Sequence, residues 1–168
     1  AVGPSTNYAR ALQEAAAILV SQGDIGAANA FFEKHRKVHT DGAELNFVVH
    51  AETLQTLGSI EAESVLSRGI SAFPTSTRLL FARANFRERA GFFDLAEADY
   101  RQILNLNPGD ANALNALGYA LTNNTDRFQE AAGLLEEAIS KDPRNPAIID
   151  SLGSVSYTHL TLPTSAIV

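Results

Sequence analysis

Two histidines, His35 and His39, are the clearest candidates for metal chemistry in this sequence. They are four residues apart, so they would share one face of a helix, as the ligands of helical zinc sites do. Arg36 and Lys37 lie between them, however, and no glutamate follows His35. We therefore predict that His35 packs in a half-buried position and that the chain holds no metal ion and no other cofactor.

Paired acidic residues could act as a general acid and a general base. Most of the pairs fall where the polar face of a helix is expected, so their simplest role is to keep that face in water. His50 has no serine at motif spacing, and the sequence contains neither a nucleophile elbow nor a glycine-rich phosphate loop. We predict no catalytic residue and expect that the protein is not an enzyme. The acidic pairs are Glu61/Glu63, Glu97/Asp99 and Glu136/Glu137.

The composition narrows the class of protein further. The chain has 168 residues, of which 45% are hydrophobic, and 13 basic against 19 acidic residues give a net charge of −6. An acidic chain of this kind is a poor nucleic-acid binder, and without cysteine it has no disulfide and no thiolate site. No apolar run approaches the roughly 20 residues of a membrane helix. Because the sequence also lacks methionine, we interpret it as a fragment of a longer protein.

Glycines and prolines recur along the chain with a period of about 34 residues. Within residues 77–110, one apolar helical face ends at Ala90-Gly91, and a second face follows and ends at Pro108. This order predicts a helix, a turn, a second helix and a stop in each period. The glycines are Gly23, Gly58 and Gly91, and the prolines are Pro74, Pro108 and Pro143.

This pattern resembles the tetratricopeptide repeat (TPR), over about residues 8–153. The repeats would span 9–42, 43–76, 77–110 and 111–145, with a fifth beginning at 146. The second repeat matches least well, because Gly58 comes one place late. The resemblance implies an all-α, right-handed α-solenoid of antiparallel helix pairs, with four repeats and the first helix of a fifth. The fourth repeat carries the match most fully, with Leu114, Leu117, Gly118, Leu121, Ala131, Leu135, Ala138 and Pro143 at the expected positions.

In this family the first helices of the repeats line a concave groove, so the resemblance implies a protein or peptide partner bound there. Asparagine amides can bond a peptide N–H and C=O, aromatic rings give rigid apolar contact, and arginines can hold a carboxylate. The chaperone-type carboxylate clamp is not matched, since only Asn85 sits at its position. Partner-helix packing is an alternative role for Phe47. The predicted groove residues are Phe47, Arg78, Phe81, Asn85, Arg89, Asn112, Asn115 and Tyr119.

A narrower resemblance concerns location. Residues 114–153 are similar to proteobacterial repeat proteins, many of them outer-membrane lipoproteins that face the periplasm, and some of these are adaptors for a protease. This implies an envelope adaptor or scaffold in the periplasm, anchored through a lipid upstream of this fragment. Its partner would be a protein such as an envelope protease or assembly factor, with no nucleic acid and no membrane insertion of the fragment itself. The alternatives are a cytoplasmic location and a structural spacer without a ligand of its own.

The last 15 residues depart from the repeat pattern. Residues 154–168 are rich in Ser, Thr and β-branched residues, and Pro163 opposes a helix. They resemble translated adapter or vector sequence, with a natural but irregular tail as the alternative. We therefore expect the solenoid to span 1–153 and an irregular, non-native tail to follow.

Overall fold

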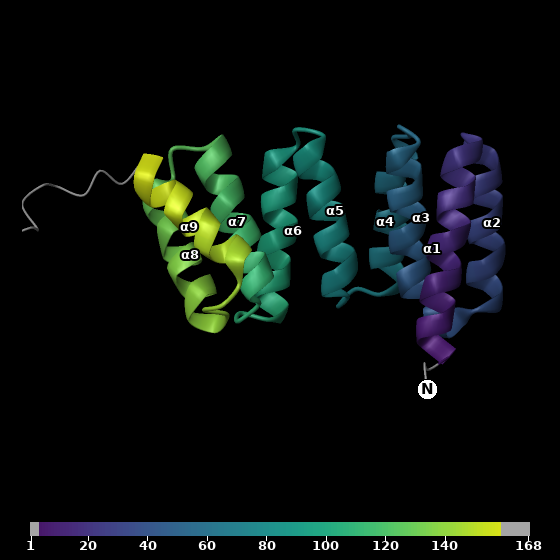
Figure 1. The fold of residues 1–168 in the computed structure, drawn as a ribbon, viewed down its shortest axis with the longest axis horizontal. Coiled ribbons are helices and arrows are strands. Elements are labelled where there is room, and N and C mark those ends of the chain that lie inside the picture. The colour runs from purple at the N-terminus through teal and green to yellow at the C-terminus, as the bar shows by residue number, and fades with distance from the viewer. Residues whose placement is uncertain (1–3, 159–168) are drawn as a thin grey trace, which may run out of the picture. The chain divides into compact units, whose positions relative to one another are not determined.

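The computed structural model describes the backbone of residues 4–158 and the side chains of residues 7–153. Throughout this part of the chain the fold is all-α, as the sequence predicts (Figure 1). The chain divides into two compact units, residues 1–87 and 88–168, and the boundary falls in the last turn of α5. The helices are α1 (Pro4–Gln22), α2 (Ile25–Val38), α3 (Ala43–Thr56), α4 (Glu61–Ala72), α5 (Thr77–Arg89), α6 (Phe93–Leu106), α7 (Ala111–Asn124), α8 (Phe128–Lys141) and α9 (Pro146–Thr158), with a short 3-10 turn η1 (Thr40–Gly42) before α3.

The helix pairs keep the period read from the sequence. Helices α3, α5, α7 and α9 begin at residues 43, 77, 111 and 146, the first residues of the second to fifth predicted repeats. Helix α1 begins at Pro4, earlier than residue 9, where the first repeat is predicted to begin. Three glycines turn the chain with φ of +69° at Gly23, +74° at Gly58 and +82° at Gly91. A Cβ at any of these positions would meet nothing within 4 Å. The left-handed backbone alone, and not a lack of space, therefore favours glycine there.

Side-chain caps fix where two of the helices begin. The carboxylate of Asp24 accepts a hydrogen bond from the backbone N–H of Ala27 at 2.9 Å, and that of Asp110 accepts one from Ala113 at 3.0 Å. Each satisfies a backbone donor that the first turn of a helix leaves unpaired. These caps hold α2 and α7 at the register that the repeat period demands.

The first unit corrects the register of the second repeat. The buried face of α3 carries Phe47, His50, Ala51 and Leu54, at i, i+3, i+4 and i+7. Asn46, Val49 and Thr53 are buried as well, so burial alone does not select the register. The turn does, because Gly58 has a positive φ, as Gly23 and Gly91 do, and this supports a repeat that begins one residue later than predicted. Phe47, predicted in the groove, is only 7% exposed and lies in the core.

In the second unit, a glycine lets two helices approach closely. A Cβ at Gly118 of α7 would lie 2.8 Å from Cγ of Leu135 and 3.1 Å from the carbonyl oxygen of Ala131, both in α8. Helix α7 also packs against α6 and α9, and Leu117 and Ile148 are completely buried. A residue without a side chain is therefore favoured at this position.

Helix α9 extends further than the sequence suggests. Residues 154–158, expected in the irregular tail, continue the helix to Thr158. Adding residues to an existing helix is far easier than starting one, so weak helix formers can extend it by a turn. Residues 159–168, the rest of the predicted tail, lie outside the described part of the chain.

Candidate functional site

A shallow groove of about 160 Å³ lies between α1 and α3 in the first unit. Its α3 wall carries Val49, Glu52 and Thr56, which the corrected register places at groove positions. Sequence analysis missed these residues, and the late Gly58 was the signal that could have found them. The α1 wall carries Gln13, Ala16, Ala17 and Val20, so the groove combines a small apolar floor with polar edges.

Three predicted groove residues of the first unit share one face of α5. Arg78 is exposed, and its Nε lies 4.0 Å from Oε1 of Glu44. Phe81 and Asn85 follow at intervals of three and four residues and are half-buried. Arg89, one turn further along the helix, is exposed and belongs to the second unit. Within the first unit, this face of α5 therefore presents an aromatic ring, an amide and one guanidinium group.

The remaining predicted residues form a stripe on α7, called here the α7 stripe: Asn112, Asn115 and Tyr119. Asn112 is exposed, and Tyr119 is 45% exposed although it is a large aromatic residue. The side chain of Asn115 is half-buried, and its Oδ1 atom is shielded from solvent without any hydrogen-bond partner. Buried acceptors are rarely left unpaired in native proteins, so this atom is suited to a donor from a bound partner.

His50 lies in a buried polar network and is inaccessible to a substrate. Its side chain has 0% exposure and stacks on Phe32 with 4.8 Å between the ring centroids. Nε2 lies 2.8 Å from Oδ1 of Asn29, and Nδ1 lies 3.0 Å from Nη2 of Arg36. A neutral imidazole that donates from Nε2 and accepts at Nδ1 satisfies both contacts. Burial, followed by the nearby Arg36 charge, lowers the pKa of His50 to about 4.

The same network explains the core position of Phe47. The guanidinium carbon of Arg36 lies 3.7 Å from the centroid of the Phe47 ring. Arg36 Nε also donates to Oδ1 of Asn46 at 3.0 Å, and Nη1 donates to Glu33 at 3.2 Å. The cation is thus neutralised, hydrogen-bonded and stacked, which compensates for its partial burial. The helix-packing role of Phe47 is therefore the one that the structure supports.

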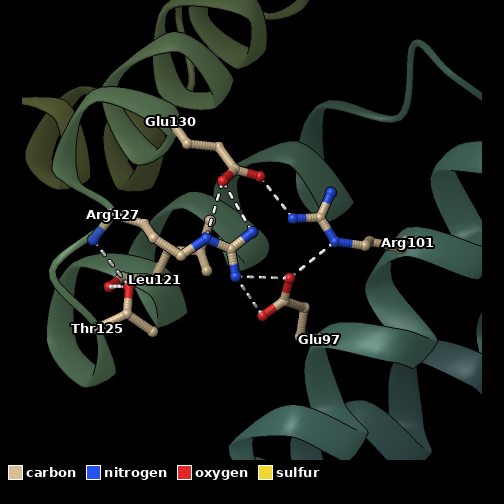
Figure 2. A network of polar contacts seen from close by, with 6 residues as sticks. All are labelled: Glu97, Arg101, Leu121, Thr125, Arg127 and Glu130. Carbon is tan, nitrogen blue, oxygen red and sulfur yellow. Dashed lines mark hydrogen bonds and ion pairs between the residues drawn. The ribbon is translucent and has the colours of Figure 1, made fainter.

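The acidic residue Glu97 belongs to an ion-pair network and is not available as a catalytic acid or base. Figure 2 shows Glu97 and Glu130 alternating with Arg101 and Arg127 between α6 and α8. Arg101 Nε donates to Glu97 at 2.8 Å, Arg127 Nη1 donates to Glu97 at 2.9 Å, and Arg127 Nη2 lies 2.7 Å from Glu130. Hydrogen bonds, first from Arg101, lower the pKa of Glu130. These four residues connect the second helices of adjacent repeats.

The loop before α8 is shaped by Thr125. Its hydroxyl donates to the carbonyl of Leu121 at 2.7 Å and accepts from the backbone N–H of Arg127 at 3.1 Å (Figure 2). These two hydrogen bonds close the loop between α7 and α8. It also positions Arg127 for the ion pairs with Glu97 and Glu130.

The described residues contain neither a group of side chains suited to hold a metal ion nor a helix suited to span a membrane. No group of three or more His, Asp or Glu side chains in residues 7–153 could hold a metal ion. The rings of His35 and His39 face each other at 5.9 Å, and His35 is half-buried as predicted. None of the helices in the described part of the chain is both long and apolar enough to cross a membrane.

Comparison with known proteins supports a repeat architecture. No family model matches the chain. A TPR repeat-containing protein of Pseudomonas aeruginosa, PA4667, is 31% identical over 157 residues, which is 93% of this chain. This chain spans only 27% of the length of that relative.

Solved structures show the same fold. A tetratricopeptide repeat protein from Parabacteroides merdae superposes with a TM-score of 0.70 at 16% identity, covering 92% of this chain and 60% of the other. The first TPR of Spaghetti (RPAP3), bound to the HSP90 peptide SRMEEVD, superposes with a TM-score of 0.54 at 22% identity, covering 80% of this chain and 94% of the other.

The antiparallel helix pairs, their glycine turns and their open helix faces define a helical-repeat protein that offers binding surfaces. The period of the pairs and the relatives then identify the repeat. The chain has the tetratricopeptide-repeat fold and is similar to a TPR repeat-containing protein, which confirms the resemblance seen in the sequence.

Proposed function

We propose that this chain is a non-catalytic interaction module that binds an extended peptide or partner protein along its first helices. The unpartnered Oδ1 atom of Asn115 is the observation that carries the proposal. This oxygen is shielded from water and accepts no hydrogen bond within the chain. The N–H of a peptide lying along α7 would supply the missing donor. An Asn side chain can also donate to a peptide C=O, so one residue can bond both groups of the same backbone.

The neighbours of Asn115 on the α7 stripe add affinity and length to this site. Tyr119, one turn later, presents a rigid ring that loses little conformational entropy when a ligand packs on it. Asn112, one turn earlier, is exposed and adds a second amide. The stripe therefore favours an extended segment that combines backbone hydrogen bonds with an apolar side chain over Tyr119.

The relatives support a peptide or protein as the ligand class. The first TPR of Spaghetti, which shares this fold, binds an HSP90 peptide. This chain lacks the charged clamp expected for a chaperone tail, so we propose a different peptide. The similarity of residues 114–153 to proteobacterial envelope proteins, together with the Pseudomonas relative, supports a role as an adaptor or scaffold in the bacterial envelope.

Affinity capture from a proteobacterial envelope extract tests the proposal. The bait is the full chain, compared with the double variant Asn115→Ala/Tyr119→Ala and with the control Gln129→Ala, an exposed residue of α8. We expect partners retained by the wild type and the control to be lost by the double variant. Equal recovery on all three baits would refute the α7 stripe and would favour a spacer role. Circular dichroism of each bait verifies that the helical fold is intact.

A further inference from the structure

One cavity of the first unit is lined by only one of the predicted groove residues, Arg78. It has a volume of about 620 Å³, within the range of small-ligand pockets, and it opens where α1 and α3 begin and α2 ends. Neither the repeat pattern nor the α7 stripe accounts for it. We call it the ring cavity, because four rings line it: Tyr8, Phe31, His35 and His39.

The rings form a continuous wall. Phe31 and His35 lie 4.2 Å apart between centroids, and the rings of His35 and His39 are nearly parallel at 5.9 Å, with 10° between their planes. Tyr8, from α1, extends the row at 4.9 Å from His39. A Cβ at position 42 would overlap the Tyr8 ring, so Gly42 leaves the space that this ring occupies. Together these rings give the cavity an aromatic lining.

The lining of the cavity is also charged. Its lining includes the carboxylates of Asp41 and Glu44 and the guanidinium of Arg78, a net charge of −1. Glu44 accepts from the Ser76 hydroxyl at 2.9 Å and lies 4.0 Å from Arg78. Asp41 has neither a side-chain hydrogen bond nor an ion pair with any residue whose side chain the structure describes. One carboxylate beside the ring wall is therefore uncompensated.

We propose that the ring cavity binds the guanidinium group of an arginine, free or in a peptide, stacked on the rings and paired with Asp41. A guanidinium is planar, so it can lie flat on a ring while its edge donates two parallel hydrogen bonds to a carboxylate. An ammonium group has the charge but not the flat face, and a carboxylate ligand would meet the repulsion of Asp41. This site is separate from the α7 stripe and does not depend on it.

Titration of the ¹⁵N-labelled full chain, followed by NMR, tests this site. The probes are the capped peptide acetyl-Ser-Arg-Ser-amide, its Lys and Glu counterparts, and free arginine. The variants are Asp41→Asn, which removes the carboxylate, and Gly42→Ala, which displaces the Tyr8 ring. Asp126→Asn is the matched control, because it removes one charge from an exposed residue that does not line the cavity.

We expect the Arg peptide to shift the amide signals of Tyr8, His39 and Asp41 and to bind at least about fivefold more tightly than the Lys peptide. Asp41→Asn should lower the affinity for the Arg peptide about tenfold, which is the contribution expected from one charge-assisted pair. Asp126→Asn should leave this affinity unchanged. If the peptide binds more tightly than free arginine, the site recognises arginine within a peptide. If the two bind equally, the site recognises the free amino acid. Equal affinity for the Glu peptide, or no effect of Asp41→Asn, would overturn the proposal. Loss of binding by Asn115→Ala/Tyr119→Ala would also contradict a separate site.

Discussion

His50 should make the stability of this protein depend steeply on pH between neutrality and mild acid. Its imidazole is completely buried, hydrogen-bonded to Asn29 and Arg36, and stacked on Phe32. A proton on Nδ1 would replace an acceptor with a donor that faces the Arg36 guanidinium, so the folded chain disfavours the charged form. Acid should therefore destabilise the fold through this side chain.

The size of this loss of stability follows from the two pKa values of His50, which are 6.5 as the ordinary value and about 4 in the folded chain. The unfolded chain takes up the proton first as the pH falls, because its pKa is higher. The stabilisation is therefore present above pH 6.5 and is lost as the pH falls toward 4. Between about pH 7 and about pH 5, this one group lowers the free energy of unfolding by ~2 kcal/mol. With a urea m-value of roughly 2 kcal/mol/M, the unfolding midpoint falls by about 1 M.

Urea unfolding at the two pH values, monitored by far-UV circular dichroism, measures this loss. The control is His50→Gln, which retains an amide donor and acceptor but does not titrate. All other groups are the same in the two proteins, so the difference between them isolates His50. We expect the wild type to lose about 2 kcal/mol more than the variant between about pH 7 and about pH 5. An identical loss in the two proteins would refute the buried, neutral imidazole.

Three further predictions concern backbone strain, packing and surface charge. Gly91→Ala should lower the free energy of unfolding, measured by urea titration, by about 1–2 kcal/mol. The reason is that φ is +82° and the added Cβ would make no contact that offsets the backbone strain; an unchanged urea midpoint would contradict this. Gly118→Ala should lower the free energy of unfolding by about 1–3 kcal/mol, because the added Cβ would overlap Leu135 and Ala131. A stabilised variant would show instead that the packing can relax. Arg127→Ala should lower the melting temperature less than either glycine variant, with an effect that shrinks at high salt, since its ion pairs are exposed. A salt-independent effect would point to packing instead.

The helix period could be predicted from the sequence because its determinants are local. A glycine that adopts positive φ, a proline that ends a helix and a side chain that caps the next one act within a few residues. Gly91, Pro108 and Asp110 are such signals, and α6 and α7 lie where they indicate. The α7 stripe is implied by the resemblance to the TPR family, and the helix period places its three residues on one face.

The register of α3 could not be predicted in this way. The pattern Asn46-Phe47-Val48-Val49-His50 is apolar on nearly every side, so periodicity alone does not select the buried face. All five side chains are in fact buried or nearly so. The choice depends on Arg36 and Asn29, which come from the preceding repeat and pair with His50. Partners that distant in sequence leave no local signal.

Polar replacements at packing positions have a common consequence for this repeat array. In the third repeat, Arg83 and Arg87 stand where the family has apolar residues, and they reach back to α4. Arg87 pairs with Glu63 at 2.8 Å with only 13% of its side chain exposed, and Arg83 donates to Ser67 at 3.1 Å. Stability in a solenoid is approximately a sum of nearest-neighbour interfaces, and a half-buried ion pair adds less to that sum than packed leucines do.

The α4–α5 contact therefore contributes less to stability than an apolar contact of the same size, but it fixes the alignment of the helices more strictly. A guanidinium has only a few positions in which its donors find acceptors, whereas apolar side chains can slide and repack. Residues at these places in the repeat thus constrain how α5 is presented to a ligand. Arg78, Phe81 and Asn85 lie on that helix. Arg83 and Arg87, which weaken the match to the repeat pattern, are therefore the residues that orient α5 and the predicted groove residues on it.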